Sequence, residues 1–412
     1  MFVHAYYEED PRVRREAETL VAAGRPVDVY ALRRPGDDRE GELAGVRIRR
    51  LNVQRHQGAG IVTYLREYIS FACRAGWAAA RAHRRRRYAL AQVHSLPDFL
   101  IFGALPLRLA GVPLLLDLHE AMPEFFRMRF PRASNPVAHR LLRIQETLSI
   151  ALATHVVTVN EALAERLVEI GVAPSKVGVV PNSPALARFD IGAHPQRPFM
   201  ADGVLRLTYA GGLTPTYEMD ILLDAVARVR LERPGVPVHL DVFGRGDSEP
   251  ALRAHAAALG IQDVVTFHGR IPLEAVPGAI AGADIGLAPT RRDPFTDLSL
   301  STKILEYGAM GRPVVASRLP MVVRSFPADT VLTYEPGDAA SLAGAILHLV
   351  DDPAERAARV AGTAALVRDR SWERAGATYV ALVESLATDG LSSTPDDRPD
   401  AMNAPAARLE DA

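Results

Sequence analysis

The chain has very little cysteine, since Cys73 is the only one among 412 residues. A single cysteine excludes an internal disulfide framework and is typical of a reducing compartment. No continuous apolar stretch is long enough to span a bilayer, and the first residues lack the pattern of a secretory signal. We therefore expect a cytoplasmic protein rather than a disulfide-rich secreted or membrane-spanning one.

Lysine is almost as rare, because Lys176 and Lys303 are the only two among 48 basic residues. Arginine and alanine are abundant, which is typical of a GC-rich genome, so arginine counts alone indicate little. The net charge is only −1, but residues 1–190 carry 27 basic against 20 acidic side chains. The excess lies within residues 51–150, with 14 basic against 6 acidic. This asymmetry indicates two domains and one charged surface of special use.

The order of short apolar runs and helical patterns favours an α/β fold of two domains. Strands alternating with helices predict a parallel sheet wound on both sides. The expected strands are residues 2–7, 27–32, 91–94, 114–118, 156–160 and 177–182, then 205–210, 238–243, 264–267, 285–288 and 314–316. We predict a first domain at 1–185, a linker at 186–203, a second domain at 204–387 and a disordered tail at 388–412.

The most informative stretch is residues 298–317, which reads as a loop, a helix and a strand. Ser301 and Thr302 supply hydroxyls suited to capping a helix start. Such a start presents free N–H groups and a partial positive charge, which suit a phosphate. Lys303 could meet a diphosphate, and Glu306 could accept hydrogen bonds from both hydroxyls of a ribose. The alternative is that these two residues form an ordinary surface ion pair.

This stretch resembles a motif of the retaining GT-B glycosyltransferases of the bacterial group 1 class, glycosyltransferase family four. The motif is S-x-K-x-x-E-Y-x-A-x-G followed by P-V-V/I-A-S, and a D-P-R-x-x-R-E-A stretch at residues 10–17 also matches. The resemblance covers roughly residues 5–386. It implies two Rossmann-like domains facing a cleft, the first holding an acceptor and the second a nucleotide-diphosphate sugar.

The resemblance also implies a chemistry. Sugar transfer would proceed with retention and without a metal or other cofactor, the protein supplying positioning and charge stabilisation. Lys303 and Glu306 are assigned to catalysis with His119, because a His just past a strand of the first domain faces the donor sugar in this family. The residues assigned to donor binding are Gly211, Gly212, Gly244, Arg245, Arg270, Ser301 and Thr302.

The acceptor side is assigned to polar residues that follow strands of the first domain, where open α/β sheets bind ligands. These residues are Asp10, His94, Asp98 and Glu120. The acceptor itself, whether a glycan, a lipid-linked sugar or a small molecule, stays open.

Two expected cations are missing. Many relatives have an arginine at Gly212 and a lysine at Tyr217, where they hold the diphosphate, and the first glutamate of their E-x7-E pattern falls here on Leu298. Lys303, or an arginine such as Arg245, Arg270 or Arg291, must then neutralise the leaving group. A sugar-nucleotide epimerase and a non-catalytic scaffold of the same architecture therefore remain as alternatives.

Two basic segments lie in the proposed acceptor domain. A helix expected at residues 60–83 runs into Arg84–Arg87, and residues 125–130 alternate aromatic and basic side chains. Together they predict peripheral binding to an anionic membrane. The alternatives are a solvated helix end and a loop partly buried between helices. Nucleic-acid binding is disfavoured, because the chain has no second basic stripe.

Overall fold

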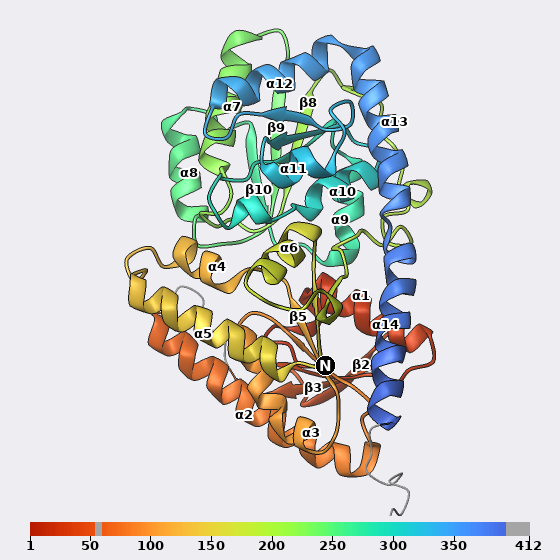
Figure 1. Ribbon diagram of the computed structural model, residues 1–412. Helices are drawn as coiled ribbons and strands as arrows, with labels where there is room; N and C mark the ends of the chain where they lie inside the picture. The colour runs from red at the N-terminus through yellow and green to blue at the C-terminus, as the bar shows by residue number, and fades with distance from the viewer. Residues whose placement is uncertain (54–59, 393–412) are drawn as a thin grey trace, which may run out of the picture.

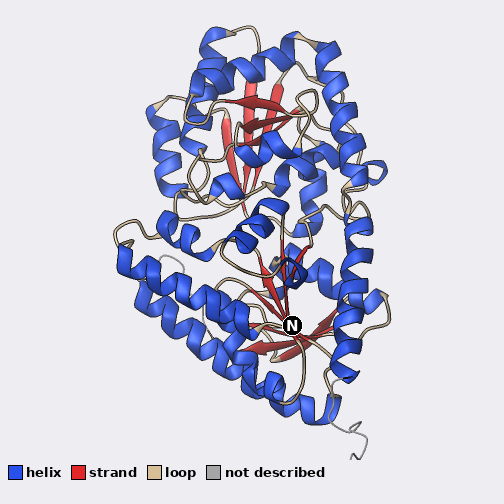
Figure 2. Cartoon of the chain, viewed as in Figure 1, coloured by secondary structure: helices blue, strands red, loops and turns tan. Residues whose placement is uncertain are grey.

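Two α/β domains lie one above the other in the computed structural model, which describes residues 1–53 and 60–392 (Figure 1). Each domain contains a twisted sheet surrounded by helices (Figure 2). The predicted α/β architecture of two Rossmann-like domains is therefore confirmed.

The sheet of the N-terminal domain has a parallel part of four strands in the order β4-β5-β6-β7 and a part of three strands in the order β1-β3-β2. The strands are β1 Asp28–Leu32, β2 Glu40–Leu43, β3 Val46–Leu51, β4 Ala91–His94, β5 Leu114–Leu118, β6 His155–Thr158 and β7 Val177–Val179. Strands β2 and β3 were not expected from the sequence, because β2 alternates exposed with half-buried residues and has little apolar signal.

The first residues join the two parts of this sheet. Phe2 forms a parallel bridge with Tyr30 of β1 and another with Val93 of β4. The strand predicted at residues 2–7 is therefore reduced to this bridge, and Tyr7–Glu9 forms a 3-10 turn instead. The helix that follows was predicted correctly, with Asp10 as its N-cap and Pro11 as its first residue.

Helices cover the N-terminal sheet. They are α1 Pro11–Ala22, α2 Ile61–Arg86, α3 Leu105–Leu109, α4 Met122–Arg129, α5 Pro136–Leu152 and α6 Glu161–Glu169, with the 3-10 helix η2 Asp98–Ala104 before α3. Helix η2 contacts both α2 and α5, so these elements form one continuous layer.

The C-terminal domain has a parallel sheet in the order β10-β9-β8-β11-β12-β13. Its strands are β8 Leu205–Ala210, β9 Val238–Phe243, β10 Val265–Gly269, β11 Ile285–Ala288, β12 Val314–Ser317 and β13 Leu332–Tyr334. Its helices are α7 Met219–Glu232, α8 Glu249–Ala258, α9 Val276–Ala281, α10 Thr302–Ala309, α11 Pro320–Ser325, α12 Ala339–Asp351 and α13 Pro353–Asp369. All predicted strands of this domain form, and β13 adds an edge.

The last helix corrects the predicted domain boundary. Helix α14 Trp372–Ser392 lies along the N-terminal domain, whereas α13 lies along the C-terminal domain (Figure 1). Trp372, Tyr379 and Val383 are buried in a core shared with α1 and β1. Residues 372–387 thus complete the first domain rather than the second, and residues 388–392 continue the helix where we expected disorder. The rest of the predicted disordered tail, residues 393–412, lies outside the described residues.

The predicted linker packs against the C-terminal domain. Phe189 is buried among α9, α10 and β12, and Asp284 accepts hydrogen bonds from Arg197 and from the backbone N–H of Met200. Residues 186–203 are irregular, as expected, but much of the segment is fixed to the C-terminal domain.

Candidate active site

The loops that follow the strands of one domain contact those of the other. Asn160, just after β6, donates through Nδ2 to the carbonyl of Leu298 at 2.9 Å, shortly before α10. Arg129 at the end of α4 forms an ion pair of 2.6 Å with Asp247, which follows β9. Since ligands of open α/β sheets bind outside the carboxyl ends of the strands, this junction is where a site would form.

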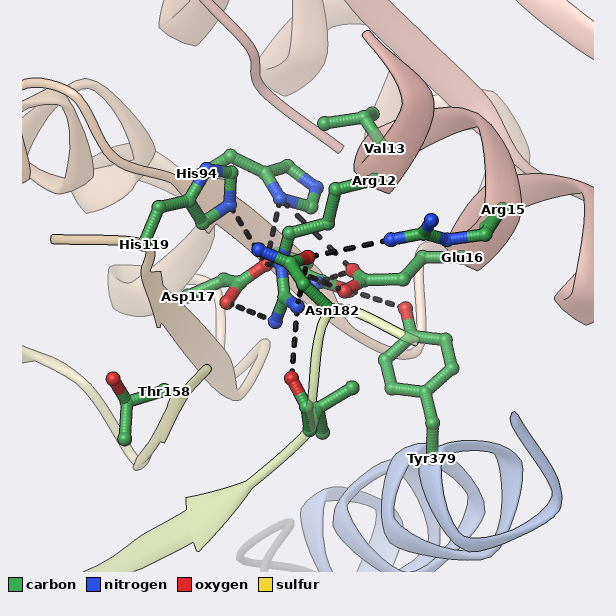
Figure 3. Close-up of polar contacts among 12 residues, drawn as sticks. Arg12, Val13, Arg15, Glu16, His94, Asp117, His119, Thr158, Asn182 and Tyr379 are labelled. Carbon is green, nitrogen blue, oxygen red and sulfur yellow. Dashed lines mark hydrogen bonds and ion pairs between the residues drawn. The ribbon is translucent and has the colours of Figure 1, made fainter. Parts of the chain in front are cut away.

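On the N-terminal side, Asp117 at the end of β5 is the centre of a buried polar network (Figure 3). Arg12 donates from Nε to Oδ2 at 2.9 Å and from Nη2 to Oδ1 at 2.7 Å. The Nδ1 of His94 and the Nε2 of His119 lie 2.9 and 3.0 Å from Oδ2. Burial alone would raise the pKa of Asp117, but these partners, Arg12 above all, hold it well below its usual value.

His119 is oriented by this network. Burial alone would lower the pKa of His119, but the charge and hydrogen bond of Asp117 raise it above its usual value. The Nε2 is used by Asp117, and the side chain remains 19% exposed. The structure therefore leaves Nδ1 of His119 for a ligand at the junction.

Arg12 connects α1 to the strand ends. Its Nη1 donates to the carbonyl of Val180 at 2.8 Å and to Oδ1 of Asn182 at 3.0 Å, just after β7. Its Nε also lies 3.1 Å from Oε1 of Glu16, one turn along α1. A buried guanidinium with so many acceptors has a fixed position, so it also fixes Asp117.

Glu16 extends the network toward α14. Gln92 of β4 donates to Oε2 of Glu16 at 2.6 Å, and the hydroxyl of Tyr379 donates to Oε1 of Gln92 at 2.6 Å. Burial raises the pKa of Glu16 to about 8, although the positive charge of Arg12 acts in the opposite direction. Figure 3 shows Tyr379 pointing from α14 into the same cluster.

The residues His94, Asp117 and His119 also offer three ligand atoms within 4.8 Å of one another. Distance alone would permit a metal ion among them. However, both oxygens of Asp117 already accept hydrogen bonds from the Arg12 guanidinium, whose positive charge opposes a second cation at this position.

On the C-terminal side, α10 begins at the junction. Ser301 occupies the N-cap position, but its Oγ is buried and has no hydrogen-bond partner among the described residues. The expected hydroxyl cap is therefore not formed, and this Oγ is left for a ligand. Thr302 is the first helical residue, and Gly311 ends the helix region with a φ of +65°.

Lys303 is held by aromatic rings rather than by a carboxylate. Its Nζ lies 3.9 Å from the ring centroid of Tyr217 and 5.3 Å from that of Tyr209. The side chain is only 7% exposed, and within the described chain no acidic group lies within ion-pair distance. Tyr217 therefore orients Lys303 through a cation–π contact.

Glu306 lies one turn further along α10 and is half-buried. No hydrogen bond or ion pair joins its carboxylate to another described residue. Burial raises its pKa, while the positive charges of Lys303, Arg15 and Arg188 act in the opposite direction. The alternative interpretation, in which Lys303 and Glu306 form an ordinary surface ion pair, is therefore wrong.

The glycines of the donor side allow close contacts between backbones and side chains. A Cβ on Gly211 would lie 2.1 Å from Cε of Lys303, and one on Gly244 would lie 1.7 Å from the carbonyl of Gly211. Gly244 also has a φ of +149°. Gly212 is different, because a Cβ there would lie no closer than 3.8 Å to another side chain.

The three arginines proposed to bind the diphosphate differ in the ion pairs that they form. Arg245 is exposed, and no ion pair joins it to the described part of the chain. Arg270 instead forms an ion pair with Glu9 across the junction, and Arg291 pairs with both oxygens of Asp220 at 2.9 and 3.0 Å. Of these three arginines, only Arg245 is placed as a free cation.

Most acceptor-side predictions are corrected. Asp10 caps α1 by accepting from the N–H groups of Arg12 and Val13. His94 is fully buried, so it supports Asp117 and does not face a ligand. Asp98 is also fully buried, and burial raises its pKa to about 8. The side chains of His94 and Asp98 are thus buried in the protein, and Asp10 is engaged as a helix cap.

Glu120 is the acceptor-side prediction that stays beside His119. It is half-buried, its Oε2 has no hydrogen-bond partner among the described residues, and burial raises its pKa to about 7. Sequence reasoning missed Arg12 and Glu16 as site residues. The D-P-R-x-x-R-E-A stretch contains both and was the available signal.

Two Rossmann-like domains with a site at their junction define the GT-B class. Sucrose-phosphate synthase from Thermosynechococcus elongatus superposes with a TM-score of 0.73 at 20% identity, over 92% of this chain and 93% of that one. HepE from Anabaena in complex with UDP-glucose gives 0.66 at 16% identity, over 95% and 99%. At these identities the likeness shows the fold alone.

The family described as "Glycosyl transferase 4-like domain" matches residues 10–183, and "Glycosyl transferases group 1" matches residues 205–352. The chain belongs to the group 1 glycosyltransferases.

Curated relatives agree with this family. A D-inositol 3-phosphate glycosyltransferase from Arthrobacter sp. is 27% identical over 288 residues, which cover 66% of this chain and 64% of that protein. A GDP-mannose-dependent monoacylated alpha-(1-6)-phosphatidylinositol monomannoside mannosyltransferase from Corynebacterium glutamicum is 31% identical over 176 residues, which cover 42% and 45%. The match thus spans less than two thirds of these relatives.

Proposed function

We propose that this chain transfers a sugar, with retention, from a nucleotide-diphosphate sugar to a glycan, lipid-linked or small-molecule acceptor. The observation that carries this proposal is the start of α10. Ser301 Oγ and the carboxylate of Glu306 lack partners in the described chain, and Lys303 lacks an anion. Groups left unsatisfied at a helix start suit a diphosphate and a ribose.

Each residue then has a role. Lys303, oriented by Tyr217, balances the charge that develops on the diphosphate as the bond from the anomeric carbon breaks. Glu306 accepts hydrogen bonds from the ribose hydroxyls, and His119 hydrogen-bonds the sugar through Nδ1. The acceptor oxygen bonds the anomeric carbon on the face that the diphosphate leaves. Its proton passes to the departing phosphate oxygen, so no protein nucleophile is needed.

We further propose that the reaction needs no metal. The cations that face the diphosphate would be Lys303 and Arg245, and the possible ligand trio His94, Asp117 and His119 is already neutralised by Arg12. Activity that persists in EDTA would support this proposal, and activity restored only by a divalent ion would contradict it.

The acceptor class is proposed from the names of the relatives. Those names specify inositol 3-phosphate and phosphatidylinositol compounds, so we propose that a phosphorylated polyol, free or lipid-linked, belongs in the first acceptor screen. We also propose peripheral association with the inner face of a membrane, which would place the enzyme beside lipid-linked acceptors.

The deciding experiment is a thermal-shift screen across nucleoside diphosphates, followed by incubation of a labelled nucleotide sugar with and without acceptors. A ligand that binds the folded state raises the melting temperature, so we expect one diphosphate to stabilise the protein and its sugar to be transferred. Isomerisation of the sugar nucleotide without an acceptor would indicate the epimerase instead. If no diphosphate changes the melting temperature, the result would indicate a non-catalytic scaffold of the same architecture.

A further inference from the structure

Exposed apolar side chains gather on one layer of the N-terminal domain. The structure describes 17 exposed large hydrophobic residues, and 12 of them lie on α2, η2, α3 and α5. They are Ile61, Val62, Leu65, Ile69 and Trp77 on α2, Phe102 on η2, Leu105 and Leu109 on α3, and Val137, Leu141, Ile144 and Leu148 on α5. We call the exposed side chains of these four elements the docking face.

The stripe on α5 is the clearest part of the docking face. Val137, Leu141, Ile144 and Leu148 follow one another at helical spacing and are 46–68% exposed. The opposite side of the helix buries Ser149 and Ile150 against the domain. An amphipathic helix normally turns its apolar side inward. Here a second apolar side faces outward, which indicates a surface that is covered in use.

The exposed charges on this face all have one sign. Each of the segments α2, η2–α3 and α5 contains one acidic residue, and these three, Glu67, Asp98 and Glu146, are all buried. The arginines of the same segments are exposed: Arg66, Arg74, Arg81, Arg84, Arg85 and Arg86 on α2, Arg108 on α3, and Arg140 and Arg143 on α5. The face is therefore apolar and positively charged, with no exposed acidic side chain on these elements.

A hollow of about 540 Å³ lies beside the α5 stripe. Arg140 and Arg143 of α5 line it with Arg127 of α4, and Ile144 and Leu148 contribute apolar surface. No ion pair joins these three arginines to another described residue. Cations around an apolar base suit a phosphate that is attached to acyl chains.

We propose that the docking face binds an anionic lipid bilayer, with its apolar side chains at the level of the headgroups and its arginines on lipid phosphates. Basic amphipathic helices bind bilayers in this way. The charge disfavours a second copy of the chain as the occupant, because two such faces would repel each other. No helix in the described part of the chain is long and apolar enough to cross a membrane, so the contact is peripheral.

This surface differs from the one expected from the sequence. The predicted patch at residues 125–130 is largely engaged within the protein: Phe125 meets Phe295 edge to face, Phe130 packs against Tyr64, and Arg129 pairs with Asp247. Residues 125–129 belong to helix α4, so the segment is neither the expected loop nor an exposed membrane patch, and of residues 125–130 only Arg127 is exposed. Arg84–Arg87 are exposed, although Arg86 forms an ion pair with Asp28.

The docking face extends toward the proposed active site. Helix α4, which carries Arg127, begins three residues after His119, and Tyr64 near the start of α2 packs against Phe130 at the end of α4. A lipid held at the hollow would thus present its headgroup near the junction. The inference rests on the proposed function only for this use of a lipid-linked acceptor; the binding itself is tested separately.

The test is sedimentation of the full chain with vesicles of phosphatidylcholine, with and without 30% phosphatidylglycerol, at low and high salt. We expect binding to anionic vesicles only, reversed by salt. Arg140→Gln with Arg143→Gln should lower the partition coefficient about 30-fold, because each arginine contributes about a factor of five. Leu141→Gln with Leu148→Gln should also reduce it, without a loss of folding, since both side chains are exposed.

Matched controls lie in the C-terminal domain. Arg228→Gln with Arg253→Gln removes the same charge from exposed positions, and Leu231→Gln changes an apolar residue that is 79% exposed. These variants should bind as the wild type does. The second measurement uses Trp77, which becomes the only tryptophan in a Trp372→Phe variant. Its emission should shift to shorter wavelength with anionic vesicles.

Several results would overturn the proposal. Wild-type protein that stays in the supernatant at low salt would do so, as would equal losses in the docking-face and control variants. A wild-type dimer that Leu141→Gln with Leu148→Gln converts to a monomer would make the face a protein interface. Nucleoside-diphosphate binding, measured in parallel without vesicles, should be unchanged in every variant. Its absence in all of them would count against the proposed function, not against the docking face.

Discussion

Substitution of Glu306 should change nucleotide binding without changing the stability of the fold. Its carboxylate contacts no described partner, so Glu306→Gln breaks no internal bond. It would weaken two charge-assisted hydrogen bonds to a ribose, each worth about 1.5–3 kcal/mol. We expect at least a tenfold loss of nucleoside-diphosphate affinity, measured by calorimetry, with an unchanged melting temperature. Wild-type affinity in the folded variant would show that Glu306 is not the ribose anchor.

His119 gives the complementary prediction on the other domain. Because Asp117 holds one ring nitrogen and the other remains for the sugar, His119→Ala should lower turnover far more than nucleoside-diphosphate binding. The partly exposed ring makes only a small contribution to the core. The control is His348→Ala, a surface residue paired with Glu355, which should leave turnover unchanged. A His119→Ala protein that unfolds would identify His119 as a structural residue.

The buried carboxyl of Glu16 should make the stability of the folded protein depend on pH. Its pKa rises from 4.5 to about 8 in the folded protein. A carboxyl whose folded pKa lies above its unfolded value favours folding while it is protonated. The stability from Glu16 is therefore fully present below about pH 4.5 and is lost as the pH rises through 8. Glu16→Gln stays neutral, so its free energy of unfolding, measured in urea, should fall less between pH 6 and 9 than that of the wild type. Parallel curves for the two proteins would contradict this.

At the scale of elements, the start of α10 works together with the loop after β8. Gly211 leaves the space that Lys303 fills, whereas a Cβ on Gly212 would make only ordinary contacts, at 3.8 Å, with Thr214 and Tyr217. Gly211→Ala should displace the ammonium group and, like Lys303→Ala, weaken binding of the nucleoside diphosphate more than of the monophosphate. Gly235→Ala is the control, because nothing lies within 4 Å of a Cβ there, and it should change neither. Binding of both nucleotides by calorimetry is the measurement. Equal losses of affinity for the diphosphate and the monophosphate would indicate that Arg245, rather than Lys303, is the main cation on the diphosphate.

The elements themselves were mostly predictable, because their signals are local. Asp10 and Pro11 begin α1, Gly311 follows the end of α10, and apolar runs form the central strands. The edge strands β2 and β13 and the bridge at Phe2 were not found. Strand β2 alternates exposed with half-buried residues, β13 has only three residues, and Phe2 pairs with strands distant in the chain, so residue type alone gives little information.

At the scale of the whole molecule, α14 joins the end of the chain to the first domain. Trp372 is 5% exposed and donates from Nε1 to Oγ1 of Thr19 at 2.8 Å. Trp372→Ala should destabilise the protein by about 3–5 kcal/mol, the usual cost of removing a buried aromatic ring. The control is Trp77→Ala, because Trp77 is 69% exposed and should change stability by no more than about 0.5 kcal/mol. Urea unfolding measures both. Similar midpoints for the two variants would show that α14 is not part of the core.

The sequence by itself determined the fold class and the segments that form the central strands, and it predicted residues for the donor side. It did so because a helix start, a glycine stop and the motif around Lys303 and Glu306 are all encoded within about twenty consecutive residues. The same local signals placed His119 just after a strand.

Only the tertiary structure decided which side chains meet. Arg12 reaches Asp117 across 105 residues and Tyr379 reaches Gln92 across 287, and no local pattern encodes such pairs. It also turned His94 and Asp98 inward and opened the apolar side of α5 to solvent. Burial and charge pairing depend on packing between distant segments, and packing is set when the chain folds as a whole.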